Sequence, residues 1–219
     1  MRFAILPVLS ILLVGSLSAV AQDRLLPQDR LLAQDRLPPI PADALSAEQK
    51  AAAEAFLVAR KTPVFGPFVP LLRSPELMTN ASTMGLHLRY RSVLPLRLSE
   101  FIILITAREW TQQLEWHIHA PIALKAGLDP AIVTAIQEGR RPDAMDPEET
   151  LVYAFSTELH HNKAVSDTTY ARAVQTFGEQ AAVEMAGING YYTLLAMSMN
   201  MARTALPEGV SPPLPPLIR

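Results

Sequence analysis

The chain has 219 residues, of which 49% are hydrophobic and 6% aromatic, and its formal net charge is -2. This length is sufficient for one domain with a sizeable core, and the composition favours an Ala- and Leu-rich helical protein over a β-sandwich. The weakly negative charge lacks the basic footprint of a nucleic-acid-binding protein. The chain has no cysteine. Disulfides, thiol nucleophiles, thiol-dependent peroxidase chemistry and Cys-ligated metal centres are therefore excluded.

Residues 1–21 have the pattern of a secretory signal peptide. Arg2 supplies the positive start, residues 3–17 are mostly apolar, and Ala-Val-Ala at 19–21 forms a small-x-small cleavage site before Gln22. The alternative is an uncleaved membrane anchor, but the apolar run is short for a spanning helix. We therefore expect cleavage before Gln22, a periplasmic or secreted location, and no stable membrane insertion afterwards.

Two segments lack the pattern of a folded element. Residues 22–44 begin with three short repeats of the Gln-Asp-Arg-Leu type and also contain Pro38, Pro39 and Pro41. Three six-residue units are too short for a solenoid, so this segment is expected to be a flexible linker rather than a docking peptide. The Pro-rich tail, residues 211–219, is expected to be extended.

Helical periodicity, capping residues and Gly or Pro punctuation predict an all-α domain over residues 45–210. The expected helices cover residues 46–60, 74–91, 99–125, 129–138, 146–161, 167–177 and 179–203. Ser46 and Gln49 have the spacing of a capping box. The long third helix is expected to break or bend near Thr111 and again at Pro121, because proline removes a backbone hydrogen bond.

Three polar side chains follow one another at helical spacing inside this long apolar segment. Gln112, Glu115 and His119 stand at relative positions i, i+3 and i+7. At about 100° per residue they fall within roughly 60° of arc, on one face of a helix. A carboxylate, an imidazole and a carboxamide on one face have the chemistry needed to transfer protons without a cofactor.

The same segment resembles the carboxymuconolactone decarboxylase family, which includes the alkylhydroperoxidase D-like proteins. Redox members carry a Glu, a Cys-x-x-Cys twelve residues later, a His four residues after the second Cys, and a Gly eight residues after that His. Glu100, Gln112, Glu115, His119 and Gly127 occupy those positions here. The Glu, His and Gly are retained, whereas both Cys positions hold other residues.

Further segments extend the resemblance over about residues 45–213. They are Val-Ser-Asp at 165–167, Gly-Tyr-Tyr at 190–192, Met-Asn at 199–200 and Leu-Pro-Glu-Gly at 206–209. The resemblance implies an alkylhydroperoxidase D-like helical bundle and a homo-oligomer, trimeric or hexameric, with pockets near subunit interfaces. The Met-rich last helix is a candidate contact surface between subunits.

The implied activity is a cofactor-free lyase or isomerase reaction on a small carboxylated lactone or keto acid. In the family's decarboxylase, loss of carbon dioxide leaves a carbanion that must be protonated. On that basis His119 is the expected proton donor, and Glu115 or Glu100 orients it and adjusts its pKa. Gln112 is expected to stabilise an enolate oxygen.

Other side chains are candidates for contacts with the substrate. Arg97 or Arg91 is expected to hold the substrate carboxylate, because arginine binds carboxylates in a bidentate manner. Trp116 either walls a pocket or packs in the core. His87, His160 and His161 are expected to have structural roles, in packing or at a helix end.

Alternatives remain open for these residues. An i, i+4 pair such as Glu115 and His119 is often a solvated surface pair, and Glu100 also fits an acid that complements the dipole at the start of a helix. His117 points about 200° from Glu115, so a metal-dependent hydrolase that uses His117 and His119 is disfavoured, and no metal is expected. A non-catalytic small-molecule binding protein of the same fold is a further alternative.

Overall fold

The computed structural model describes residues 35–216, and the expected signal peptide and the repeats before residue 35 lie outside this range. Every regular element within the described range is helical, which confirms the all-α class for this part of the chain. The elements are η1 (Ala42–Ala44), α3 (Ala47–Arg60), α4 (Phe68–Leu71), α5 (Pro75–Tyr90), α6 (Leu96–Glu109), α7 (Gln113–Lys125), α8 (Pro130–Gln137), α9 (Pro147–Asn162), α10 (Asp167–Phe177) and α11 (Glu179–Ala202).

Local capping signals in the sequence locate most helix ends. The predicted capping box of α3 is present, with the Ser46 side chain and the Gln49 side chain each bonded to the other's backbone N–H. The break near Thr111 is confirmed: Thr111 has φ of 47° and separates α6 from α7. No break occurs at Pro121, because α7 continues to Lys125 around it.

Helix α6 begins earlier than the sequence analysis predicts. Its first residue is Leu96, directly after Pro95, rather than a residue next to Ser99. Proline is well suited to a helix start, since the first N–H groups of a helix have no intrahelical partner. Glu100 therefore lies in the second turn and is completely buried. The interpretation of Glu100 as a first-turn acid that complements the helix dipole is wrong.

The core is centred on α6, which is buried on all sides over most of its length. Leu98, Phe101, Ile102 and Leu104 have no solvent exposure. Helices α7, α8, α9 and α11 all contact α6, as expected for a helix without a polar face. Glu100 is carried into the middle of this core by α6, in which every residue from Leu98 to Arg108 is buried.

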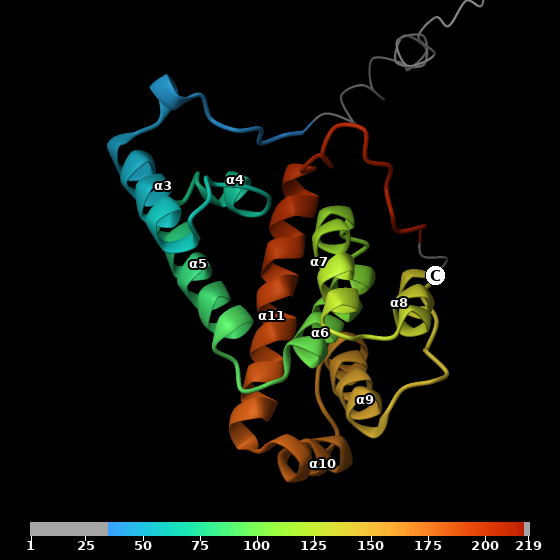
Figure 1. Ribbon diagram of the computed structural model, residues 1–219. Coiled ribbons are helices and arrows are strands. Elements are labelled where there is room, and N and C mark those ends of the chain that lie inside the picture. The colour runs from blue at the N-terminus through green and yellow to red at the C-terminus, as the bar shows by residue number, and fades with distance from the viewer. Residues whose placement is uncertain (1–34, 217–219) are drawn as a thin grey trace, which may run out of the picture. The chain divides into compact units, whose positions relative to one another are not determined.

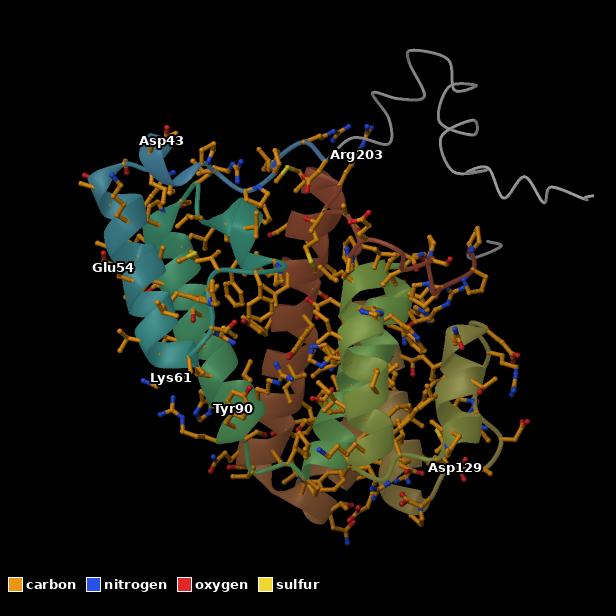
Figure 2. The ribbon with its side chains drawn as sticks, turned by 45° about the horizontal axis from the view of Figure 1, so that its top comes forward. Asp43, Glu54, Lys61, Tyr90, Asp129 and Arg203 are labelled. Atoms are coloured by element: carbon orange, nitrogen blue, oxygen red, sulfur yellow. The ribbon has the colours of Figure 1, made fainter. Side chains whose placement is uncertain are left out.

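The long helix α11 lies between two groups of helices. Figure 1 shows α3, α4 and α5 on one side of α11, and α6, α7, α8 and α9 on the other. Helices α3 and α5 pack against each other. Figure 2 labels Lys61, which follows α3, and Tyr90, which ends α5, and both lie towards the same end of these two helices. Helix α11 also packs directly against α5 and α6. Side chains from both groups therefore meet along α11.

The described parts of the predicted linker and tail make fixed contacts with the helices. Arg36 donates from its backbone N–H to the Ala202 carbonyl oxygen at 2.7 Å, and Arg73 donates to the Pro38 carbonyl oxygen at 2.6 Å. At the other end, the extended tail passes towards α8 (Figure 1), where Gln137 donates to the Pro213 carbonyl oxygen. Residues 35–44 are thus attached to the domain rather than forming a free tether.

Candidate active site

A buried histidine lies between two glutamates at the junction of α6 and α7. The Nδ1 atom of His119 is 2.7 Å from Glu100 Oε2, and its Nε2 atom is 3.3 Å from Glu115 Oε2. All three side chains are at least 96% buried. We call this group the Glu–His–Glu triad. The surface-pair alternative for Glu115 and His119 is therefore wrong, because both residues lie inside the protein.

The turn between α6 and α7 explains how the triad is assembled. Thr111 reverses the chain in the left-handed region, and the side chain of Gln112 then caps α7 by accepting hydrogen bonds from Leu114 N and Glu115 N. Glu115 and His119 follow one turn apart on α7, and α7 packs against α6. This packing brings Glu100 to the second ring nitrogen of His119.

Gln112 does not join the helix face that the periodicity predicts. It is the N-cap of α7, with an extended backbone, so the helical angle of 100° per residue does not apply to it. Its amide nitrogen donates to Asn200 Oδ1 at 3.2 Å. In the structure the Gln112 side chain orders the start of α7 and holds it to α11, and it does not touch His119.

The electrostatics of the triad favour a charged imidazole. Burial alone would lower the pKa of His119, but the hydrogen bonds and negative charges of Glu100 and Glu115 outweigh burial and raise that pKa above its ordinary value. The imidazolium can donate through both ring nitrogens at once. One oxygen of each carboxylate, Glu100 Oε1 and Glu115 Oε1, is buried and has no hydrogen-bond partner among the described residues.

The triad borders a cavity of about 30 Å³ between the two groups of helices. This volume holds roughly one water molecule. Glu115 and His119 line the cavity, whereas Glu100 lies behind them. Glu115 is therefore placed to exchange a proton with the cavity, and His119 connects it to Glu100.

Two tyrosines from α11 close one side of the cavity. The Tyr192 ring meets the His119 ring edge to face, with 5.1 Å between centroids. Burial raises the pKa of Tyr191 to about 12, against the opposing charge of Arg60, and burial raises the pKa of Tyr192 well above its ordinary range. Both phenols therefore remain protonated at neutral pH.

A glycine makes room for one of these phenols. A Cβ placed on Gly85 of α5 would lie 2.1 Å from the Tyr191 hydroxyl oxygen, so any larger residue would displace the ring. The two tyrosines belong to the Gly-Tyr-Tyr segment at 190–192, which is part of the family resemblance. Nothing in the local sequence around Gly85 indicates its role, because the residue that it makes room for, Tyr191, is more than 100 residues later in the chain.

The cations at the cavity differ from those predicted. Arg60, at the end of α3, and Arg89, near the end of α5, line it. Arg60 donates to Ser82 Oγ and to the Ser82 carbonyl oxygen, both at 2.9 Å, and its guanidinium lies 4.6 Å from the centroid of the Phe68 ring. Sequence spacing could not indicate that Arg60 and Arg89 meet at this cavity, since they come from a different group of helices than the triad does.

The predicted arginines lie elsewhere. Arg97 forms ion pairs with Asp146, Glu148 and Glu149 at the start of α9, and so it stabilises that helix start. Arg91 is exposed and is not part of the cavity lining. Neither residue contacts the Glu–His–Glu triad. The cavity is lined by Arg60 and Arg89 rather than by Arg97 and Arg91.

Trp116 and the other histidines have separate surroundings. Trp116 is buried in the hydrophobic core and does not line the triad cavity. His87 is half exposed, and its Nε2 atom forms a hydrogen bond of 3.2 Å with Glu184 Oε1 rather than packing against apolar surface. His160 contacts Thr106 and His161 contacts Glu109, in addition to their position at the end of α9.

His117 is only partly buried and is not part of the cavity lining. Within residues 35–216, no group of three His, Asp or Glu side chains has the arrangement needed to hold a metal ion. No helix in that same range is long and apolar enough to span a bilayer.

Comparisons of the chain with known protein families, curated proteins and solved structures gave no match. The case for a function therefore rests on the geometry of the site and on the sequence resemblance.

Proposed function

We propose that the protein is a cofactor-free, decarboxylase-like lyase or isomerase that acts on a small carboxylated lactone or keto acid. The observation that carries this proposal is His119, buried between Glu100 and Glu115 with one carboxylate on each ring nitrogen. A cluster of this kind is costly to bury and adds little stability. Perturbed titratable groups beside a cavity are instead a common feature of proton-transfer sites.

In the proposed reaction, heterolysis of the bond between the substrate carbon and its carboxylate releases carbon dioxide and leaves the electron pair on that carbon. The carbanion then takes a proton from the triad. His119 stores this proton, and Glu115, whose free Oε1 is buried at the cavity, passes it on. A proton from water restores the imidazolium. In the isomerase form of the reaction, Glu115 first removes a proton and later returns it.

Arg60 and Arg89 are the proposed anchors for the substrate anion, since both line the cavity with Glu115 and His119. Arginine holds a carboxylate or an enolate oxygen through charge-assisted hydrogen bonds. The protonated phenols of Tyr191 and Tyr192, which also line the cavity, are additional donors. A dry site with fixed donors favours the charge that develops in the transition state.

The cavity must enlarge to admit such a substrate, because its present volume suits only a water-sized molecule. Phe65, which lines the cavity and is 36% exposed, is the proposed gate. It lies in the connection between α3 and α4 rather than inside a helix. Movement of this connection would open the site without disturbing the helices that carry the triad.

The same small volume favours the second candidate, a non-catalytic binding protein of this fold. In that case the triad would serve only to bind and orient a small polar ligand. Turnover separates the two proposals, because a binding protein saturates with ligand but leaves it chemically unchanged.

The test is a panel of small lactones and keto acids incubated with the protein in deuterated water, with product and deuterium incorporation followed by NMR. Glu115→Gln and His119→Ala are expected to lower turnover by roughly 10²–10⁴-fold, the usual contribution of a positioned proton donor. His117→Ala is the matched control and should retain most of the activity. Circular dichroism checks folding. Full activity in folded His119→Ala, or activity that depends on His117 and an added metal, would overturn the proton-transfer proposal.

A further inference from the structure

A second and larger cavity, of about 520 Å³, lies between α6, α8 and α9. It shares no lining residue with the triad cavity. Its volume is within the range of small-molecule sites, roughly 300–1,000 Å³. The side chains around it combine cations with apolar surface, and this combination indicates the kind of ligand it would take.

Arg108 is the most informative residue of this cavity. It is only 5% exposed, and its Nη1 atom donates to the Pro215 carbonyl oxygen at 2.7 Å. Its Nε atom is buried and has no hydrogen-bond partner among residues 35–216. In this range no carboxylate forms an ion pair with Arg108. A buried cation with an unused donor is costly, and a bound anion would remove that cost.

The surrounding charges also favour an anion. Lys163 and Arg140 line the cavity with Arg108, against one carboxylate, Glu109. Glu109 is already engaged, since it lies 3.2 Å from His161 Nε2. Arg140 is partly neutralised, with Glu138 at 2.6 Å and Asp143 at 3.6 Å. Of the arginines and lysines that line this cavity, Arg108 and Lys163 therefore have no ion pair with a carboxylate among residues 35–216.

The other residues that line the cavity indicate what the uncharged part of the ligand would contact. Ile105 and Ile136 are buried at this cavity, and the half-buried ring of Tyr153 adds a flat apolar wall. Apolar walls around a few fixed polar groups are typical of sites that bind a cyclic organic molecule and orient it by its charged end.

We propose that this cavity binds a small cyclic carboxylic acid, with the carboxylate at the guanidinium of Arg108 and near Lys163, and the ring against Ile105, Ile136 and Tyr153. The site is independent of the proposed reaction, because it requires none of the residues of the Glu–His–Glu triad. It would provide a second binding site on the same domain.

The experiment is calorimetric titration of the full chain with benzoate, and with benzamide as a neutral probe of the same shape. Benzoate should bind saturably and benzamide at least 10-fold more weakly. Arg108→Met, which keeps much of the side-chain volume, should weaken benzoate binding by roughly 10–100-fold, as expected for loss of a charged hydrogen bond. Lys163→Gln should weaken it several-fold. Arg172→Gln, an exposed arginine on α10, is the matched control and should bind as the wild type does.

Three results would overturn the proposal: no saturable benzoate binding, equal binding of benzamide, or unchanged binding in folded Arg108→Met or in Lys163→Gln. If Arg108→Met does not fold, Lys163→Gln alone provides the test. Lys163 is exposed, so its substitution should not disturb the fold. Glu115→Gln distinguishes the two cavities. Loss of benzoate binding in that variant, with retention in Lys163→Gln, would place the acid at the triad instead.

Discussion

His119 is held in one orientation because each of its ring nitrogens has a carboxylate partner. With the imidazole protonated and both glutamates ionised, the triad carries a net charge of one negative unit inside the core. Breaking such a buried cluster by removing one partner is destabilising, since it leaves an uncompensated charge. The triad therefore couples two properties that can be measured separately, the protonation of His119 and the stability of the fold.

The raised pKa of His119 predicts how stability changes with pH. A group whose pKa is higher in the folded state contributes stability that is fully present below its unfolded pKa, about 6.5, and is lost as the pH rises through the folded value. The wild type should thus lose more stability between about pH 6 and 9 than His119→Gln does. Melting temperatures across this range test the prediction, with His117→Gln as the control that keeps the wild-type pH dependence.

The account would be contradicted if the melting temperatures of the wild type and of His119→Gln changed in parallel with pH. Such a result would show that His119 binds its proton equally well in the folded and unfolded states.

Only the local half of the triad could be read from the sequence. Glu115 and His119 are one helical turn apart, so their contact follows from spacing alone once α7 is recognised. The contact of Glu100 with His119 depends on how α6 and α7 pack, and only the family resemblance suggested it. Arg60 and Arg89 belong to helices that meet the site across the fold. No local pattern encodes that meeting, and Arg97 and Arg91, the arginines predicted from the sequence, lie outside the cavity lining.

At the scale of elements, the caps were predictable because capping is local chemistry. Ser46 with Gln49, and Asp146 with Glu149, both form the reciprocal hydrogen bonds of a capping box. Gln112 was misplaced for a related reason. Its side chain caps α7, and a capping residue lies outside the helical periodicity that the prediction assumed.

Another buried carboxylate, Glu184, joins α11 to the connection between α5 and α6. It accepts hydrogen bonds from Ser92 Oγ at 2.7 Å and Val93 N at 2.8 Å, while Gln180 donates to its other oxygen at 3.0 Å. Burial would raise the pKa of Glu184, but these bonds and that of His87 lower it to about 2. The ionised carboxylate therefore holds two elements together.

We predict that Glu184→Ala lowers the free energy of unfolding by roughly 1–3 kcal/mol at neutral pH, the usual cost of leaving buried donors without a partner. Because the folded pKa is depressed, this contribution is present above the ordinary value of 4.5 and is lost as the pH falls towards about 2. Urea unfolding at pH about 7 and about 3 measures it. Glu54→Ala, at an exposed position on α3, is the control. A deficit that is equally large at both pH values would show that the ionised form is not what stabilises the contact.

At the scale of the whole molecule, periodicity identified the longer helices, but not the four-residue α4 or the way the helices assemble. The segment of α6 is mostly apolar, and the helix is buried. Which helices pack against it depends on the fit between side chains that lie far apart in the sequence. The trimer or hexamer stays a prediction. Met197 and Met201 on α11 are more than half exposed, and they supply apolar surface for such a contact.

Two deletions test the role of the N-terminal segment. Removing residues 22–34 is expected to leave the oligomeric state and the melting temperature of the mature protein nearly unchanged, because the sequence there is repetitive and predicts no helix. Removing residues 22–44 should lower the melting temperature, since it also deletes the bonds of Arg36 to Ala202 and of Arg73 to Pro38. Light scattering and thermal unfolding provide the two measurements. A change to monomer on the shorter deletion would instead make residues 22–34 part of the assembly.

The central claim is that His119 stores a proton between two carboxylates, and ¹⁵N NMR titration of its imidazole tests this without a known substrate. The account predicts a His119 pKa above the ordinary value of about 6.5, with both ring nitrogens protonated near neutral pH. Glu100→Gln and Glu115→Gln should each lower that pKa, because each removes one negative neighbour. A His119 pKa at or below 6.5 that neither substitution changes would contradict the proton-storing triad.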